Sequence, residues 1–380
     1  MKFKPIAGLA IAASALLVVS GCTSGGADPA PASETEAPSA DYFLDPVAEE
    51  ISEEGAQRIT ELYEAALAAG EDELSIISGL ADDMVPTWDL FEATFPGIKV
   101  TYASLIGGPL ITQLQTEAQS GNHVTDVLHN PNGQQYVDFA QEYEVVNLVV
   151  PEALQNSASE LKDPGNKYTS PFIGFFGLGA FLPREQGQGL TPPTLWTDLT
   201  APELRGQVVM GDPNLPGPSQ DAPIYLIENG AFTEADIEAL AKNVIIKGTY
   251  GDAIAALMQG EAVYMFAAPS SALISAGRAG APVEFRLMDK DNYVVTHKQL
   301  LLEGAPHPNV AKLYIEWLNT LSAQKQLAVS GQAPLNTNGA DPDAPWTNWV
   351  TANVTSIVPA ANVDASRPAF IEKFKTIFTQ

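Results

Sequence analysis

Between positions 45 and 130, segments with hydrophobic residues at helical spacing take turns with short segments of the kind found in strands. Helical spacing predicts three helices, at Asp45–Gly70, Met84–Phe95 and Gly107–Ala118. Asp45 and Pro46 supply N-terminal capping residues for the first helix, and Gly70 supplies its C-terminal cap. Short apolar or alternating runs predict three strands between them, at Leu74–Ser78, Ile98–Tyr102 and Val124–His129. Strands and helices that alternate at this spacing predict a parallel, doubly wound α/β unit.

A second α/β region follows after residue 170. Pro171–Leu182 is apolar and rich in glycine, which is the character of a strand that runs between two lobes. Further strands are predicted at Gln207–Met210, Ala262–Ala267, Val283–Met288 and Lys298–Leu302. Helices are predicted at Ala235–Lys242, Asp252–Gln259, Ser270–Arg278, Asn309–Leu321, Ser322–Ser330 and Ala369–Phe378. The fold class is therefore expected to be α/β, with two such regions.

The composition narrows the range of functions. The chain of 380 residues carries 46 acidic and 19 basic side chains, which gives a formal net charge of −27. A protein this acidic is repelled by phosphate backbones, so nucleic acid is excluded as a main partner. Cys22 is the single cysteine, so neither an intrachain disulfide nor a cysteine-cluster zinc site can form. No apolar stretch after residue 22 has the length that a membrane span needs.

The first 22 residues have the pattern of a secretory signal peptide. Lys2 and Lys4 precede an apolar segment from Ile6 to Val19. The following Ser20-Gly21-Cys22 resembles the bacterial lipobox, which implies cleavage after residue 21 and a lipid on the Cys22 thiol. An ordinary signal peptide with an incidental cysteine is the alternative. Residues 22–44 are rich in Gly, Ala, Pro, Ser and acids, which predicts a flexible tether. Together these segments place the protein at the outer face of the cytoplasmic membrane.

Several blocks further along the chain resemble a known family by their order and spacing. They are Leu90-Phe91-Glu92 with Phe95-Pro96-Gly97-Ile98-Lys99-Val100, Thr125-Asp126-Val127, Trp196-Thr197-Asp198-Leu199 with Gly206-Gln207-Val208 and Asp212-Pro213, and His307-Pro308-Asn309-Val310-Ala311. This set is similar to the extracellular solute-binding proteins of bacterial ABC importers, in the branch that includes ferric-iron, polyamine and phosphonate binders. The similar segments cover roughly residues 58–335.

The resemblance implies two doubly wound α/β lobes joined by crossing strands, the type 2 periplasmic-binding-protein fold, which closes on a solute. It divides the chain into a signal peptide at 1–21, the tether at 22–44, a first lobe at 45–175 and 290–380, and a second lobe at 176–289. It implies a small-molecule solute and ABC permease subunits as partners. We expect no cofactor, no enzymatic activity, and a monomer attached to the membrane by its lipid.

Ligands of open α/β lobes bind beyond the carboxyl ends of the strands, and this rule selects the candidate contacts. In the first lobe they are Ser78, Gly79, Ser104, Gly107, Gly108 and Asn130. In the second lobe they are Ser219, Gln220, Ser270 and Ser271. The helix that opens at Gly107 offers free backbone N–H groups to a carboxylate or phosphate, and Ser219 and Ser270 could act from the other lobe. Both serines could instead be plain helix N-caps.

The residue types argue against a metal site. Ferric members of the family typically bind iron through a tyrosine pair, often with a histidine of the first loop. The matching positions here are Ser270-Ser271 and Gly79-Leu80. Ferric iron is a hard ion that needs phenolate oxygens, so we expect no metal. Tyr102, Tyr136 and Tyr250 leave an unconventional arrangement open.

The charge of the solute also stays open. Asp82 and Asp83 follow the first predicted strand and could meet an amine, or they could form a solvated helix N-terminus. Enzyme motifs are not found: the chain has no G-x-S-x-G, P-loop or H-E-x-x-H sequence. Ser159–Lys162 matches S-x-x-K without its companion motifs, and we interpret it as chance. The rival hypothesis is a lipid-anchored envelope enzyme or scaffold that uses the same fold.

Overall fold

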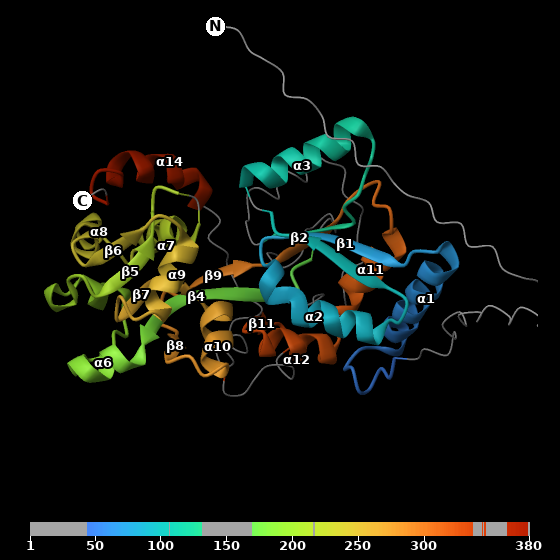
Figure 1. The fold of residues 1–380 in the computed structure, drawn as a ribbon, viewed down its shortest axis with the longest axis horizontal. Coiled ribbons are helices and arrows are strands. Elements are labelled where there is room, and N and C mark those ends of the chain that lie inside the picture. Colours follow the sequence, from blue (N-terminus) through green and yellow to red (C-terminus); the bar gives the residue numbers. More distant parts are fainter. Residues whose placement is uncertain are drawn as a thin grey trace, which may run out of the picture. The chain divides into compact units, whose positions relative to one another are not determined.

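The computed structural model describes residues 44–105, 107–130, 169–215, 217–336, 344, 346 and 363–378. All of them belong to one compact unit, Ala40–Gln380, whose strands form two sheets (Figure 1). The predicted signal peptide, Cys22 and all of the tether except Leu44 lie outside the described residues.

The first sheet has four strands in the order β10-β3-β1-β2. Its parallel strands are β1 (Glu73–Ser78), β2 (Lys99–Ala103) and β3 (Val127–Asn130). The fourth strand, β10 (Lys298–Leu301), is antiparallel to β3. The helices of this part are α1 (Glu53–Ala69), α2 (Ala81–Thr94), α3 (Gly107–Ser120), α11 (Pro308–Trp317) and α12 (Leu321–Val329). The parallel, doubly wound unit predicted for residues 45–130 is confirmed.

Aromatic side chains fill the core beneath this sheet. Trp88 and Phe91 of α2 and its C-cap Phe95 are buried. The Phe91 ring meets Tyr314 and Trp317 of α11 edge-on, at centroid distances of 5.3 and 5.2 Å. The indole Nε1 of Trp88 donates a hydrogen bond to the Tyr314 hydroxyl at 3.0 Å. Each such buried ring contributes about 1.5–3 kcal/mol, so α11 is tied firmly to α2 although it comes late in the sequence.

The second sheet has seven strands in the order β11-β4-β7-β5-β6, with β8 and β9 also paired to β4. Its parallel strands are β5 (Val208–Gly211), β6 (Val244–Lys247) and β7 (Tyr264–Pro269). The strands antiparallel to the long β4 (Phe172–Phe181) are β7, β8 (Val283–Arg286), β9 (Tyr293–Thr296) and β11 (Ala333–Pro334). The helices are α6 (Leu182–Gln188), α7 (Pro218–Glu228), α8 (Glu234–Ala241), α9 (Tyr250–Met258) and α10 (Ser270–Arg278), with short 3-10 turns at Trp196–Thr200 and Pro202–Leu204.

The glycines of β4 are explained by how closely its neighbours approach. A Cβ atom on Gly177 would lie 2.4 Å from the carbonyl oxygen of Arg286, and one on Gly179 would lie 2.7 Å from Leu273. A Cβ on Gly174 would lie 2.6 Å from the His297 ring. Any side chain would therefore force these neighbours apart, and the glycine-rich run predicted as a strand is confirmed as the strand that the second sheet is built around.

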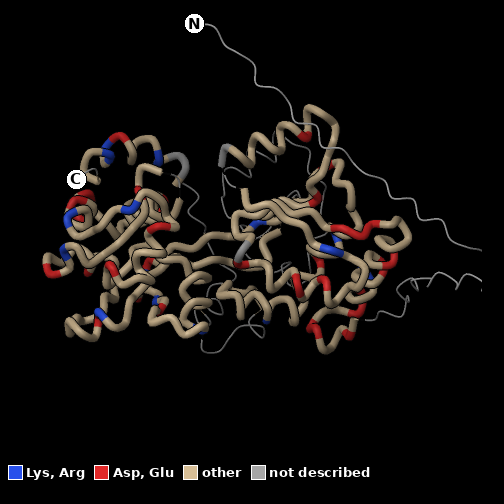
Figure 2. Tube along the Cα trace, in the orientation of Figure 1, with Lys and Arg blue, Asp and Glu red and all other residues tan. Residues whose placement is uncertain are grey.

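The start of the first helix differs from the prediction. Asp45 caps a turn instead of α1, since its Oδ1 accepts from the backbone N–H groups of Val47 and Ala48. The helix begins at Glu53, and Ser52 is its N-cap, accepting from the N–H of Gly55 at 3.0 Å. The predicted C-cap, Gly70, is confirmed with φ of 73°. Acidic residues gather along α1 and the adjoining turns (Figure 2).

The C-terminal helix α14 (Val363–Phe374) packs against α7 of the second sheet (Figure 1). It begins earlier than the predicted Ala369, and its apolar residues Phe370 and Phe374 are buried in the same cluster as Leu226. The sequence-based division placed residues 290–380 in the first lobe, and for this helix the packing is with the second instead. Ala222, Ile224 and Leu226 of α7 belong to the same apolar cluster.

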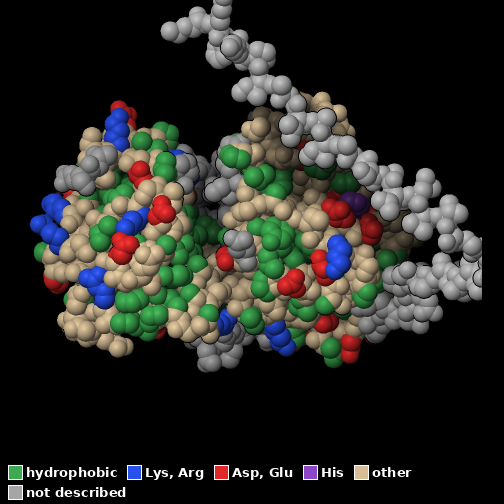
Figure 3. Space-filling model, in the orientation of Figure 1, with side chains coloured by type: hydrophobic (Ala, Val, Ile, Leu, Met, Phe, Trp, Pro, Cys, Tyr) green, Lys and Arg blue, Asp and Glu red, His purple; other side chains and the backbone are tan. Residues whose placement is uncertain are grey.

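No described helix has the length and apolar character required to cross a bilayer. On the face drawn in Figure 3, hydrophobic side chains are interspersed with polar and charged ones.

Candidate functional site

The carboxyl ends of β1, β2 and β3 lie at one edge of the first sheet, because the three strands are parallel neighbours. Ser78 ends β1, Ser104 follows β2, and Asn130 ends β3. Gly107 and Gly108 are the first two residues of α3. The structure therefore brings the first-lobe candidates to the same sheet edge, and their contact with a solute stays a prediction.

Ser78 and Gly79 shape the turn from β1 into α2. The Ser78 hydroxyl is buried, accepts a hydrogen bond from the backbone N–H of Leu80 at 3.0 Å, and lies 3.0 Å from Nδ1 of His129. The N–H of Gly79 donates to the carbonyl of His129 at 3.3 Å. Leu80 is the N-cap of α2, and its side chain makes no capping hydrogen bond. The hydroxyl of Ser78, at the end of β1, instead binds the backbone N–H of Leu80. Ser104, in contrast, is exposed.

In the second sheet, Ser219 and Gln220 bind the loop that joins β5 to α7. The Ser219 hydroxyl accepts from the N–H of Gly211 at 3.0 Å, and Gln220 donates through Nε2 to the carbonyl of Pro213 at 2.8 Å. Both side chains are buried. The N-cap of α7 is Gly217, with φ of 141°, so Ser219 is not the plain N-cap that the sequence left as an alternative. It fastens the end of a strand to the start of a helix.

Ser270 and Ser271 open α10, directly after the carboxyl end of β7. Pro269 is the N-cap, so Ser270 is not a plain N-cap either; its hydroxyl accepts a long, 3.4 Å hydrogen bond from the N–H of Phe175. Ser271 donates its hydroxyl proton to Oδ2 of Asp83 in α2, at 2.7 Å. That contact links a helix of the second sheet to a helix of the first. The side chain of Asp82 lies outside the described residues.

His129, His297 and Phe172 form a buried cluster of rings that was not predicted from the sequence. The Phe172 ring stacks on His297 with centroids 4.7 Å apart, and His129 lies 5.5 Å from Phe172 and 5.7 Å from His297. Within the described part of the chain, Nε2 of His129 and Nδ1 of His297 have no hydrogen-bond partner. The available signal was the polar pair His297-Lys298 inside an otherwise apolar run that leads into β10.

Loss of water controls the protonation of this cluster. Burial lowers the pKa of His129 to about 3. Burial also lowers the pKa of His297 well below its usual range, and the proximity of His129 and Lys298 adds to the effect. The pKa of Lys298 falls to about 8 for the same reason, while its Nζ donates to the Thr296 hydroxyl at 2.8 Å. At pH 7 both imidazoles are neutral, and most Lys298 side chains keep their proton.

Among the described residues, no group of three or more His, Cys, Asp or Glu could hold a metal ion. The Tyr250 hydroxyl donates to the carbonyl of Ala267 at 2.6 Å, and burial raises the pKa of this tyrosine, which disfavours its phenolate. Tyr102 is half exposed, and its ring centroid lies 4.8 Å from that of Trp88. Tyr136 and Ser159–Lys162 lie outside the described residues.

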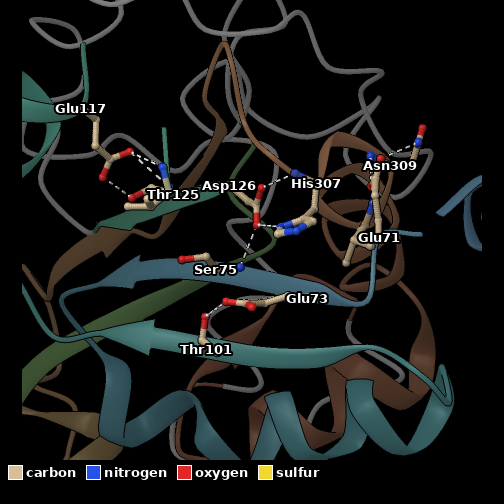
Figure 4. Close-up of polar contacts among 11 residues, drawn as sticks. Glu71, Glu73, Ser75, Thr101, Glu117, Thr125, Asp126, His307 and Asn309 are labelled. Atoms are coloured by element: carbon tan, nitrogen blue, oxygen red, sulfur yellow. Dashed lines mark hydrogen bonds and ion pairs between the residues drawn. The ribbon is translucent and has the colours of Figure 1, made fainter. Parts of the chain in front are cut away.

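Two of the sequence blocks meet at the opposite, amino-terminal end of β1 and β3 (Figure 4). The fully buried carboxylate of Asp126 accepts from the N–H of Ser75 at 2.8 Å and the N–H of His307 at 2.7 Å, and lies 3.0 Å from the His307 Nδ1. Glu71 accepts from both the backbone and the side-chain nitrogen of Asn309, each at 2.8 Å. These motif residues join α11 to the first sheet and lie away from the candidate edge.

Comparison with known proteins supplies the family. A family model described as bacterial extracellular solute-binding protein matches residues 68–325. No curated protein matches the sequence. Solved structures that share the fold include three periplasmic or substrate-binding proteins. The periplasmic binding protein AfuA from Actinobacillus pleuropneumoniae, with fructose-6-phosphate bound, is 18% identical with a TM-score of 0.59, over 80% of this chain and 98% of its own.

The other two structures are similar in extent. The substrate-binding protein of an ABC transporter from Agrobacterium tumefaciens is 17% identical with a TM-score of 0.67, covering 81% of this chain and 94% of its own. The apo ferric ion-binding protein A of Pasteurella haemolytica is 15% identical with a TM-score of 0.61, covering 81% and 100%.

At these identities the structures establish the fold, and they confirm the predicted α/β architecture of the type 2 periplasmic binding proteins. The family match covers more than half of the chain and includes strands of both sheets. The chain belongs to the bacterial extracellular solute-binding proteins, the substrate-binding receptors of ABC importers.

Proposed function

We propose that this protein is a lipid-anchored receptor that binds a small polar solute non-covalently between two lobes and delivers it to the permease subunits of an importer. The observation that carries the proposal is the family match across residues 68–325. The lobes are those of the sequence-based division, except that β9, β11 and α14 go with the second. Solute binding requires no cofactor, and we propose that the receptor acts as a monomer and not as an enzyme.

The candidate edges differ in what they can offer to a solute. Ser78, Ser219 and Gln220 are buried and already hydrogen-bonded to backbone groups of their own loops. We therefore assign them to the shaping of those loops. We propose that the exposed Ser104 and the backbone at the start of α3 contact the solute directly. The N–H groups at the start of α3 favour an acidic group of the solute.

A thermal-shift screen tests the proposal. The panel contains polyamines, phosphonates, sugar phosphates, amino acids and metal ions. A true solute at 100 times its dissociation constant adds about 2.7 kcal/mol to the free energy of unfolding. A hit that is recovered chemically unchanged supports the receptor. Turnover of the hit would identify the lipid-anchored enzyme instead, and a panel without any hit would contradict the binding of a small polar solute.

The lipid anchor is tested separately, because Cys22 lies outside the described residues. Two acyl chains, at about 0.8 kcal/mol for each buried CH₂, hold a protein stably at a bilayer. Cys22→Ser should therefore leave unprocessed or shed protein. The measurement is detergent partitioning of the two forms expressed in a bacterial host, and equal partitioning would contradict lipidation.

A further inference from the structure

The tail of the chain carries an arginine that reaches the second-lobe candidate edge. Arg367 lies in α14, and its Nη1 donates to Oε1 of Gln220 and to Oδ1 of Asp221, both at 2.5 Å. The guanidinium is largely buried, with 17% of the side chain exposed, and Asp221 is buried beneath it at 6%. Charge-assisted hydrogen bonds in such a setting are about twice as strong as neutral ones.

Gln220 transmits this contact to the loop between β5 and α7. Its carbonyl oxygen faces the cation of Arg367, so the amide nitrogen must face the other way. There it donates to the carbonyl of Pro213, the second residue after β5. Ser219 holds the beginning of the same loop through Gly211. The loop is therefore fixed at two points, and one of them depends on a residue of the C-terminal helix.

The helix that carries Arg367 is itself anchored along its length. Phe370 and Phe374 are buried in the second-lobe core. Ser366 is hydrogen-bonded to Glu228 of α7, and Lys373 forms an ion pair with Glu234 at the start of α8. Among these polar residues of the described structure, only Arg367 is hydrogen-bonded to Gln220, because the hydrogen bond of Ser366 lies further along α7 and the ion pair of Lys373 lies on α8.

We infer that Arg367 is a positioning residue of the solute-binding edge: through Gln220 it holds residues 212–215 in place at the carboxyl end of β5. That a solute binds at this edge rests on the proposed function, whereas the positioning of the loop by Arg367 does not. The inference also gives a role to the chain after residue 335, whose helix completes the second lobe from the far end of the sequence.

Hydrogen exchange of the full, ligand-free protein tests the inference. In the native loop, the N–H of Asn214 is bonded to Asp212 Oδ1 at 2.8 Å and that of Leu215 to the Asp212 carbonyl at 3.1 Å. In Arg367→Met we expect these amides to exchange about tenfold faster, the factor typical of losing a charge-assisted hydrogen bond. The matched control is Lys373→Met, on the same helix, which should leave the loop unchanged.

Two further measurements separate positioning from general damage. Exchange at Phe370 and Phe374 reports whether α14 stays docked, and urea unfolding reports global stability, which would accelerate exchange everywhere. If Arg367→Met undocks the helix, Arg367→Lys keeps the charge and should restore most of the loop protection. Loop exchange that stays as slow as in the wild type in Arg367→Met, with the helix docked, overturns the inference. Loop exchange in Arg367→Lys that is as fast as in Arg367→Met overturns it too. A screen without hits overturns the proposed function and leaves this result standing.

Discussion

The buried imidazoles of His129 and His297 should make the protein lose stability in mild acid. In the unfolded chain a histidine binds a proton with a pKa near 6.5, but burial lowers the folded pKa of His129 to about 3. The free energy of unfolding is therefore at its full value above about pH 6.5, where the imidazole is neutral in both states. It falls as the pH drops from there towards the folded pKa, because only the unfolded chain binds the proton. Protonation in the folded state would place a charge beside Phe172 and close to Lys298.

The size of the effect follows from the unfolded pKa. At pH 5 the unfolded state gains about 2 kcal/mol for each histidine that stays neutral in the folded state, since pH 5 lies 1.5 units below the unfolded value. Burial lowers the pKa of His297 in the same direction, so this residue adds to the loss of stability. The loss of about 2 kcal/mol for His129 alone is a sizeable part of the stability of an ordinary domain.

The test is urea unfolding at pH 8 and at pH 5, followed by tryptophan fluorescence. His129→Gln keeps a polar group next to Ser78 but cannot titrate, so its loss between the two pH values should be about 2 kcal/mol smaller than that of the wild type. His123→Gln, outside the ring cluster, is the control. An equal loss in wild type and His129→Gln would refute the neutral, buried state of this imidazole.

Three further outcomes are expected. Asp126→Asn should lower the free energy of unfolding by about 2–3 kcal/mol in urea, because it weakens an acceptor used by three donor groups; a loss under about 0.5 kcal/mol would contradict their bonding. Gly331→Ala should lower the melting temperature more than Gly230→Ala, since both have positive φ but only at Gly331 would the new Cβ lie 2.7 Å from Ser271 Cα; equal shifts would contradict the close packing. Protein mixed with ferric citrate and desalted should stay colourless, because Ser270 and Ser271 supply no phenolate; a persistent red or orange band with stoichiometric iron would contradict this.

Strongly periodic segments could be predicted from the sequence, and their reasons are local. α10 begins at Ser270 as predicted, because a proline ends the preceding strand and the apolar residues that follow have helical spacing. α7 was not predicted, because Pro218 and Pro223 both fall within it. Pro218 occupies the first turn, where a missing N–H costs nothing, and this placement makes the helix possible. Asp45 and Pro46 gave an equally good local signal for the start of a helix, but Asp45 caps a turn instead.

The candidate site could be predicted only in part, because strand order decides which edge a residue reaches but not where its side chain turns. Ser78 and Ser219 do lie at carboxyl ends of strands, yet their hydroxyls bind backbone N–H groups nearby. Nothing local shows that His297 will lie beside His129, since the pairing of β10 with β3 brings them together. The contact of Arg367 with Gln220 is equally non-local.

The antiparallel position of β10 has a consequence for the order of folding. During synthesis β1, β2 and β3 emerge first, but the strand that covers the open edge of β3 arrives only with residues 298–301. Near the amino ends of these strands, the backbone N–H of His307 donates a hydrogen bond to the carboxylate of Asp126, and the two residues are 181 positions apart in the sequence. Contacts this distant slow folding, since a long loop must close before they form. A nascent chain that ends before residue 298 therefore exposes an apolar strand edge, although β1, β2 and β3 have already been made.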